Sequence, residues 1–184
     1  MCKGKIIGIM LVITLMILSS CSIMPKRQVI DNFYISESPQ LVVRFEKDIR
    51  EHKKNAGWET FTFYSGIPIG IKIESNRNNA NQIDYYYPLY KIMSNFHMYN
   101  MGSRYINDHE WGQFAYVNSH NKLIVGYFTR KDHYFIYVYT WESMTEEAIR
   151  SFEYYQKTLD ISQSDKRYLQ NLMEKINKQI EIVK

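Results

Sequence analysis

Five histidines are the side chains of this sequence best suited to metal binding or acid–base chemistry, and they stand at positions 52, 97, 109, 120 and 133. His109 lies between two carboxylates, in Asp108-His109-Glu110, while His120 and His133 fall at the ends of predicted strands. A metal site at a loop edge would form if these side chains converged. Their spacing matches no known ligand pattern, so solvated loop histidines are the favoured interpretation, with no metal and no cofactor.

The sequence motifs of common catalytic and nucleotide-binding sites are absent: the sequence has no GxSxG, HExxH, GxGxxG, CxxC or P-loop pattern. Nucleophilic catalysis by sulfur is not expected either, because Cys2 lies in an N-terminal segment that is predicted to be removed and Cys21 is predicted to carry lipid. We therefore predict that the protein is not an enzyme. The alternative is an envelope hydrolase or metal-binding protein that uses Asp108, His109 and Glu110.

The N-terminal residues have the pattern of a secretory signal peptide. Residues 1–5 contain two lysines and no acid, residues 6–18 form an uncharged apolar run, and Ser19, Ser20 and Cys21 follow. The run is shorter than the roughly 20 residues that a membrane-spanning helix needs. Residues 1–20 are therefore predicted to be removed. The alternatives are an uncleaved helix, or ordinary secretory cleavage followed by a chance cysteine.

The end of this run, Leu18-Ser19-Ser20-Cys21, resembles the lipobox of bacterial lipoproteins. The resemblance implies that signal peptidase II recognises Leu18, Ser19 and Ser20 and cuts before Cys21, whose thiol carries a diacylglyceryl group and whose new amino group is often acylated. Each buried methylene contributes about 0.8 kcal/mol, so two or three acyl chains would anchor the chain stably to a membrane. Because Ser22 is not Asp, the resemblance favours the outer membrane and a periplasm-facing domain, or the cell surface if the host has a single membrane.

Composition limits the remaining classes of protein. The 184 residues are 45% hydrophobic and 15% aromatic, which excludes a disordered tail protein, and a single long apolar run excludes a multi-pass membrane protein. The formal net charge of +4 includes Lys3 and Lys5 of the predicted signal peptide, so the mature chain is less basic than the whole sequence. Nucleic acid is therefore not an expected partner.

Residues 21–37 are predicted to form a lipidated tether, and residues 38–184 a single domain. The tether contains Pro25 and shows no sustained hydrophobic period. After it, Ser38-Pro39 has the form of a helix start, and apolar residues at helical spacing predict a helix over residues 39–55. A strand over residues 41–45 is the alternative.

The hydrophobic period changes to two from Trp58 onward. Apolar side chains occupy odd positions, at Phe61, Phe63, Ile67, Ile69, Ile71 and Ile73. We predict two strands here, joined by a tight turn near Gly66, and then a polar loop over residues 75–82. Three further strands, over residues 110–118, 122–129 and 133–140, are separated by short polar connections and predict an antiparallel meander.

Three more helices are expected. One covers residues 87–100 and ends at Gly102, one starts at Ser143 with Glu146 in a capping box, and one starts at Ser164. The last helix has an apolar seam that favours packing on the sheet over pairing with a partner helix, formed by Leu169, Leu172, Met173, Ile176, Ile180 and Val183. Because both faces of the strand over residues 133–140 are apolar or aromatic, we predict an α+β fold, an α/β/α sandwich whose antiparallel sheet has helices on both faces.

This order of elements resembles the Mog1/PsbP-like fold over about residues 57–160. The resemblance is carried by Lys122-Leu-Ile-Val-Gly-Tyr127, by the strand from Tyr134 to Thr140 and by a helix that contains Ser151-Phe152. It implies an α/β/α sandwich, and its bacterial members include periplasmic and lipid-anchored proteins of mostly unknown role. The helices predicted over residues 39–55 and after Ser164 depart from that pattern.

The 16 tyrosines are more than a core of this size holds easily, and three of them are consecutive. Tyrosine is enriched at interfaces, so Tyr85, Tyr86 and Tyr87 are a candidate surface for a protein partner or a glycan. Half-buried sheet tyrosines are the alternative. We predict a lipid-anchored, non-catalytic binding or accessory module of the cell envelope, either a subunit of an envelope complex or a periplasmic immunity protein.

Overall fold

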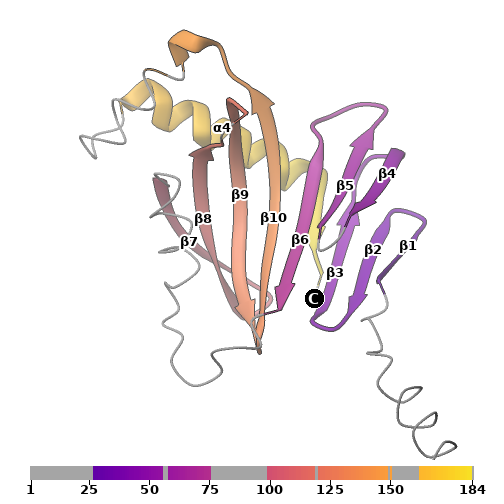
Figure 1. Cartoon of the computed structure of the whole chain (residues 1–184). Coiled ribbons are helices and arrows are strands. Elements are labelled where there is room, and N and C mark those ends of the chain that lie inside the picture. The colour runs from indigo at the N-terminus through magenta and orange to yellow at the C-terminus, as the bar shows by residue number, and fades with distance from the viewer. Residues whose placement is uncertain are drawn as a thin grey trace, which may run out of the picture.

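The computed structural model describes residues 27–55, 58–75, 99–118, 120–148, 150 and 162–183. Most of these residues are in strands, and a single long helix precedes the last strand (Figure 1). The elements in chain order are β1 (Arg27–Ile30), β2 (Phe33–Glu37), β3 (Gln40–Phe45), β4 (Ile49–Asn55), β5 (Trp58–Phe63), β6 (Ile69–Ser75), β7 (Tyr99–Ile106), β8 (His109–Val117), β9 (Lys122–Lys131), β10 (Tyr134–Ser143), α4 (Gln163–Gln179) and β11 (Ile180–Ile182).

The strands form two antiparallel sheets. The smaller sheet has the order β1-β2-β3-β11, and the larger has the order β4-β5-β6-β10-β9-β8-β7. Two runs of consecutive strands, β4 to β6 and β7 to β10, join in the larger sheet where β6 pairs with β10. The edge strands of the larger sheet are β4 and β7. β4 is exposed and contains two lysines, and exposed lysines protect an edge strand from pairing with another chain.

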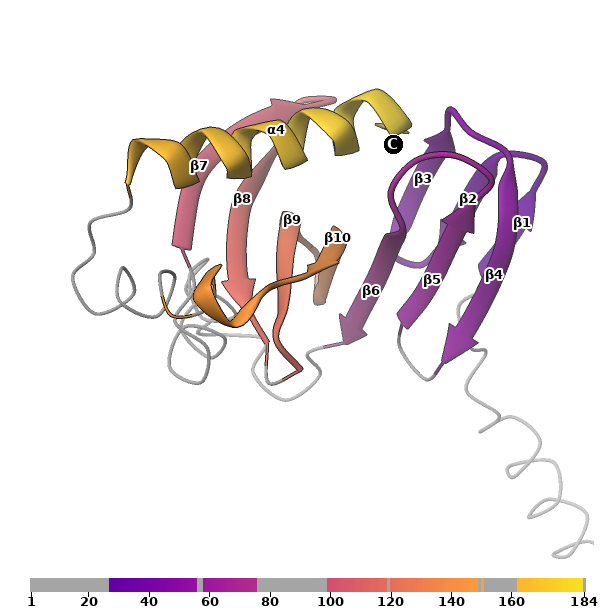
Figure 2. The ribbon, with the colours of Figure 1, turned by 90° about the horizontal axis from the view of Figure 1, so that it is seen from above.

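One face of the seven-stranded sheet, here called the inner face, covers the main hydrophobic core. Figure 2 shows that the four-stranded sheet lies over β4, β5 and β6, while α4 lies over the β7 to β10 half. The buried core residues come from all three layers and include Phe45, Phe61, Ile136 and Ile176. The core is therefore enclosed between two sheets and one helix, and the opposite face of the seven-stranded sheet, the outer face, points away from it.

The strands predicted from the period of two are confirmed. Phe61, Phe63, Ile69, Ile71 and Ile73 are all buried on the inner face, in β5 and β6. The predicted meander is also confirmed as β8, β9 and β10, and β7 extends it by one strand. Short turns at residues 107–108 and 132–133 connect β7 to β8 and β9 to β10, and Asn107, Asp108 and Asp132 adopt the positive φ that Asn and Asp tolerate best.

The N-terminal part of the domain differs from the prediction. From Arg27 onward the expected tether over residues 21–37 is replaced by β1 and β2, and Tyr34 of β2 is completely buried. The helix predicted over residues 39–55 is wrong, because β3 and β4 occupy this segment and the alternative of a strand over residues 41–45 is correct. Ser38 and Pro39, joined by a cis peptide bond, form the turn between the paired residues Glu37 and Gln40 instead of starting a helix.

The last predicted helix is present in the structure. The last helix is confirmed as α4, and its seam packs on the sheet through Leu169, Leu172, Met173 and Ile176. The Ser162 hydroxyl, not Ser164, caps it by accepting from the Asp165 N–H at 3.2 Å. The helix ends at Gln179, since Ile180 is extended and begins β11.

Gln179 fastens the end of α4 to the turn between β5 and β6. Its buried side-chain amide accepts from the Ile67 N–H at 2.8 Å and donates to the Ile67 carbonyl at 2.5 Å. Gly66 has φ +115° and lies so close that an added Cβ would come within 2.3 Å of Gln179 Oε1. The glycine is therefore required both for the backbone conformation and for this contact.

Two other predicted helices lie mainly outside the described residues. Of the helix over residues 87–100, only the last two residues are described, and they begin β7, while Gly102 lies inside this strand with φ +95°. The helix predicted from Ser143 starts later, because β10 runs to Ser143 and the Ala148 N–H bonds to Thr145 Oγ1 at 3.3 Å. Residues 146–148 and 150 are helical.

The prediction of an α/β/α sandwich is wrong, and so is the fold implied by the Mog1/PsbP-like resemblance. The inner face of the seven-stranded sheet is covered partly by a second sheet, built from segments that were assigned to a tether and to helices. On the outer face, aromatic rings bury one another: Phe114 packs edge-on to Tyr137 and lies beside Phe128 and Tyr116. An aromatic face on both sides of a strand therefore did not indicate a helix layer on both sides.

Candidate functional site

Two groups of predicted site residues lie outside the described residues. These are the lipobox, Leu18, Ser19, Ser20 and Cys21, and the candidate interaction surface, Tyr85, Tyr86 and Tyr87. Within the described residues, no helix is long and apolar enough to cross a membrane.

The structure does not bring all three histidines of the predicted loop-edge site together. His109 begins β8 and His120 follows the end of the same strand, so they lie at opposite ends of the sheet. His109 Nε2 lies 2.9 Å from the Arg130 carbonyl, and the His133 ring packs against Tyr134. No group of three or more His, Cys, Asp or Glu side chains suited to holding a metal ion occurs in the described part of the chain.

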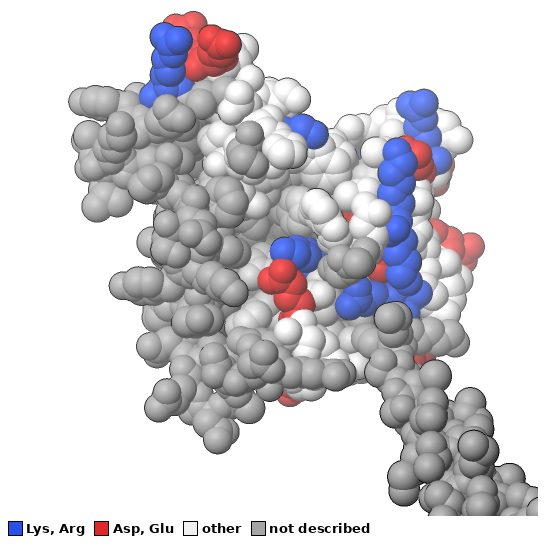
Figure 3. Space-filling model, in the orientation of Figure 1, with Lys and Arg blue, Asp and Glu red and all other residues white. Residues whose placement is uncertain are grey.

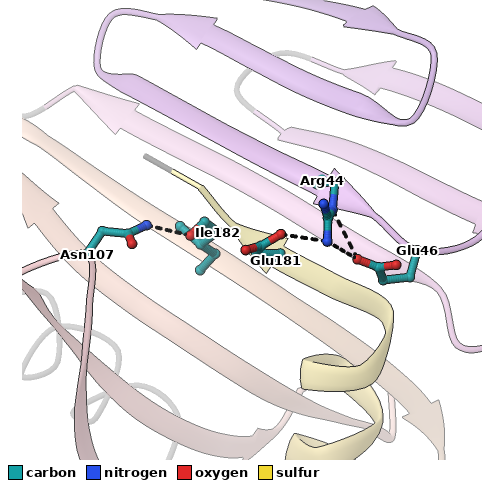
Figure 4. A network of polar contacts seen from close by, with 5 residues as sticks. All are labelled: Arg44, Glu46, Asn107, Glu181 and Ile182. Atoms are coloured by element: carbon teal, nitrogen blue, oxygen red, sulfur yellow. Dashed lines mark hydrogen bonds and ion pairs between the residues drawn. The ribbon is translucent and has the colours of Figure 1, made fainter.

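Asp108 and His109 line a pocket of about 280 Å³ at the junction of the two sheets, together with Trp111, Ile136 and Ile182. The polar side chains at this pocket hold the sheets together. Asn107 Nδ2 donates to the Ile182 carbonyl at 2.7 Å (Figure 4), and Lys131 Nζ donates to the Gln40 carbonyl at 2.9 Å. Asn107, in the turn after β7, therefore bridges to β11, and Lys131 of β9 bridges to β3.

A buried carboxylate forms a second link between the sheets. Glu59 of β5 is 1% exposed, its Oε2 lies 2.8 Å from His52 Nε2, and its Oε1 accepts from the Tyr34 hydroxyl at 3.4 Å. Burial raises the pKa of Tyr34, and the charge of Glu59 raises it further. Sequence reasoning missed this cluster, although Glu59 has the same odd-numbered parity as the buried residues Phe61 and Phe63.

The His52 ring is held by packing as well as by its contact with Glu59. The His52 ring stacks on Phe61 at a centroid distance of 4.6 Å, which fixes its position at the edge of the core. Arg27 Nε and Ser36 Oγ, on neighbouring strands of the smaller sheet, are the buried side-chain N or O atoms without a hydrogen-bond partner among the described residues. Neither atom bonds to Glu59 or His52, so the cluster links the two sheets through Tyr34 alone.

The outer face of the seven-stranded sheet carries a pocket that we call the aromatic pocket. Figure 3 looks onto this face. The pocket has a volume of about 380 Å³, within the usual range of roughly 300 to 1,000 Å³ for ligand sites. Its walls are Trp58, Lys72, Glu74, Phe114, Tyr116, Ile124, Tyr137 and Tyr139.

Strand register brings these side chains together. Trp58 of β5 pairs with Lys72 of β6, and Lys72 pairs with Tyr137 of β10, so the three form a row across the sheet. Lys72 Nζ lies 6.0 Å above the Tyr137 ring centroid and 2.5 Å from Glu74 Oε1. Trp58 is 46% exposed, whereas the ring of Tyr137 is almost fully buried. The pocket thus has an accessible indole at one side and a charge pair beside its buried floor.

Glycines allow the aromatic rings to lie close to the sheet. A Cβ added to Gly70 would come within 2.5 Å of the Tyr139 ring, and one added to Gly112 would come within 2.1 Å of the Phe128 ring. Tyr139 pairs with Gly70 on one side and Gly126 on the other. The rings therefore occupy space that side chains at these positions would fill.

The tyrosine hydroxyls of the aromatic pocket remain protonated at neutral pH. Burial raises the pKa of Tyr139 to about 12, with a further contribution from Tyr116. Burial also raises the pKa of Tyr137 and of Tyr116, and the nearby Glu74 charge adds to both shifts. These groups therefore act as neutral donors and acceptors of hydrogen bonds.

The outer face of the four-stranded sheet carries a group of apolar side chains, and we call this group the aliphatic face. Its residues point away from the core by strand alternation and are Ile30, Phe33, Ile35, Val42 and Val183. Phe33 is 37% exposed, and Ile30 and Val183 are more exposed still. Single exposed apolar residues are ordinary, but a group on one sheet face is typical of an interaction surface.

A charged cluster borders the aliphatic face (Figure 4). Arg44 Nη2 lies 2.7 Å from Glu46 Oε1 and 2.8 Å from Glu181 Oε2, which links β3 to β11. All three side chains are about half exposed, so these ion pairs contribute little to stability. Their effect is to hold a guanidinium in a fixed position beside the apolar residues, as at the rim of many protein interfaces.

Comparisons with known proteins assign no relative to this chain: no protein-family model matches it, and no curated protein sequence matches it.

Proposed function

We propose that this protein is a lipid-anchored, non-catalytic binding module of the bacterial cell envelope that docks a protein partner through the aliphatic face. The observation that carries the proposal is the exposure of Ile30, Phe33 and Val183 on one sheet face beside the fixed Arg44. Burying such a face on a partner removes apolar surface from water and is favourable by roughly 25 cal/mol per Å².

The distance from the predicted anchor supports a partner at the membrane. β1 begins at Arg27, six residues after Cys21. Because a residue spans at most about 3.6 Å, β1 lies within roughly 20 Å of a lipidated Cys21. The aliphatic face, of which Ile30 in β1 is part, is thereby kept near the membrane surface. A partner that is itself a component of the envelope fits this position.

The anchor is tested by Cys21→Ser. We expect this variant to be soluble or unprocessed, and mass spectrometry of the mature wild-type chain to find a lipid-modified first residue. An unmodified sulfur at that residue, or unchanged membrane fractionation of the variant, would contradict the anchor.

Docking is tested by placing a photoreactive amino acid at position 33 in living cells. We expect one crosslinked envelope protein, lost when Arg44→Glu is added. The control is the same probe at Tyr64, which is 78% exposed and lies outside the aliphatic face. Equal crosslinking from both positions would overturn the proposal. A crosslink in unchallenged cells supports a complex subunit, whereas one that needs a foreign toxin supports an immunity protein.

The alternative, an envelope hydrolase or metal-binding protein, is tested on the purified chain. Stoichiometric zinc that is lost in His109→Ala would favour that alternative over a purely binding role. We expect no such zinc, because His109 is engaged by the Arg130 carbonyl and lies at the far end of β8 from His120.

A further inference from the structure

The aromatic pocket is a second recognition site, distinct from the aliphatic face. It lies on the outer face of the seven-stranded sheet, whereas the aliphatic face belongs to the four-stranded sheet. The protein partner of the proposed function therefore does not account for it. What the pocket binds follows from three properties: its ring surfaces, its hydroxyls and its charges.

The walls offer ring faces at different inclinations. The Phe114 and Tyr116 rings are nearly parallel, at 24° and a centroid distance of 6.0 Å, while Tyr137 stands edge-on to Phe114 at 86°. The exposed indole of Trp58 completes the lining on β5. A ligand with a flat apolar surface would pack on such rings, since aromatic side chains supply large contact area at little entropic cost.

Two hydroxyl groups of the pocket are available to a ligand. No described residue forms a hydrogen bond with the Tyr137 or the Tyr139 hydroxyl, and neither oxygen is among the fully buried unpaired atoms, so solvent reaches both. A ligand that covers them must replace their bonds to water, because a polar group buried without a partner is costly. The ligand is therefore expected to carry donors and acceptors along its edge.

The charges of the pocket indicate an uncharged ligand. The Lys72 ammonium is neutralised by Glu74 at 2.5 Å, so the pair attracts neither an anion nor a cation strongly. It does present a donor and an acceptor side by side. A fatty chain or an aromatic peptide side chain would cover the rings but leave this pair and the tyrosine hydroxyls without partners.

We propose that the aromatic pocket binds an uncharged pyranose ring of an oligosaccharide. One face of such a ring presents C–H groups that pack on aromatic rings, and its hydroxyls both donate and accept hydrogen bonds. The C–H face lies against Trp58 and Phe114, and the ring hydroxyls meet Tyr137, Tyr139 and the Lys72 and Glu74 pair. The pocket volume of about 380 Å³ is sufficient for one or two sugar rings.

The test is saturation-transfer NMR on the purified full chain with three neutral probes: the trimer of N-acetylglucosamine, cellotriose and maltotriose. We expect saturable binding of at least one probe at millimolar concentration or below. Trp58→Ala should weaken it about tenfold or more, which corresponds to the loss of one aromatic contact. Tyr137→Phe, which removes only the hydroxyl, should weaken it roughly three- to tenfold.

Two matched variants separate this proposal from the docking of a protein. Tyr64→Ala removes an exposed aromatic ring outside the pocket and should leave sugar binding unchanged. Phe33→Asp disrupts the aliphatic face and should also leave it unchanged, so either function can fail without the other. The proposal is overturned if no probe binds saturably, if Trp58→Ala and Tyr137→Phe both bind as the wild type does, or if an aromatic peptide or a fatty acid binds more tightly at this pocket.

Discussion

Tyr34 and Tyr137 are both buried tyrosines, but they lie on opposite sides of the seven-stranded sheet, and their hydroxyls differ in hydrogen bonding. Tyr34 faces the core, where its hydroxyl donates to the buried Glu59 at 3.4 Å. Tyr137 lies on the outer face, where its ring is buried among other rings and no described residue bonds to its hydroxyl. Burial raises the pKa of both, so both hydroxyls stay protonated.

The difference separates a structural polar group from one available to a ligand. On the inner face, the side chains of Glu59 and Gln179 are buried and each makes two hydrogen bonds, which fix the second sheet and the end of α4 in place. On the outer face, glycines make room for rings, and no described residue bonds to the hydroxyls of Tyr137 and Tyr139. The same sheet therefore uses one face for stability and offers the other for recognition.

The largest expected contrast between the two faces is in β5, where Phe61 and Trp58 point in opposite directions. Phe61→Ala should reduce the free energy of unfolding by about 3–5 kcal/mol, because it opens a cavity in the closed core. Trp58→Ala should cost less than about 1 kcal/mol, since the indole is half exposed. Urea unfolding measures both. Similar losses for the two variants would show that the outer face is as important to stability as the core.

A smaller effect is expected at Gly112, which lies beneath the Phe128 ring. Gly112→Ala should reduce the free energy of unfolding by about 1–3 kcal/mol, because the new methyl group would meet the ring. The double variant Gly112→Ala with Phe128→Leu should recover part of that loss, since the shorter side chain leaves room. If the double variant is no more stable than the sum of the two single changes predicts, the ring and the glycine are not coupled as the structure shows.

The direct comparison of the two tyrosines gives a still smaller difference. Tyr34→Phe should cost about 1 kcal/mol, because it removes a partner from a buried carboxylate. Tyr137→Phe should cost no more than about 0.5 kcal/mol or be neutral, since it removes a hydroxyl that has no described partner. Thermal unfolding under identical conditions decides the order. The reverse order would mean that the outer hydroxyl already has a structural role.

A further effect, confined to alkaline solution, is expected at Tyr139. Its pKa is raised from 10.0 to about 12 by burial, so above pH 10 the unfolded chain loses this proton while the folded chain keeps it. The stabilising contribution is complete below pH 10 and declines as the pH rises toward 12. Denaturant unfolding across this range should therefore show a shallower decline in Tyr139→Phe than in the wild type. Equal slopes would indicate that Tyr139 is already exposed to solvent in the folded state.

Part of the fold could be predicted from hydrophobic periodicity. The period of two in β5 and β6, and the short polar turns of the meander, are properties of contiguous residues and were identified correctly. The segment from residue 39 failed because Leu41 and Phe45 are four residues apart, which suits one helical turn and also two strand periods. Only pairing with β2 and β11 makes it a strand.

The candidate sites were predictable to a smaller degree. Histidines and tyrosine runs stand out in a sequence, but His109 and His120 lie at opposite ends of β8. The aromatic pocket gathers residues from β5, β6, β8, β9 and β10, none of which is distinctive alone. Glu59 and Phe61 lie on the same face of β5, so the burial of Glu59 could be predicted only if the second sheet covering that face was known.

The sequence by itself predicts where the protein is located, since a signal peptide and a lipobox would act as linear segments, and it determined the strands whose pattern repeats locally. Tertiary structure alone decided that residues 27–45 and 180–182 form a second sheet, and that the rings of distant strands enclose a pocket. The physical reason is that strand pairing and burial depend on partners far away in the chain. Two residues on neighbouring strands become neighbours only when the register between those strands is fixed.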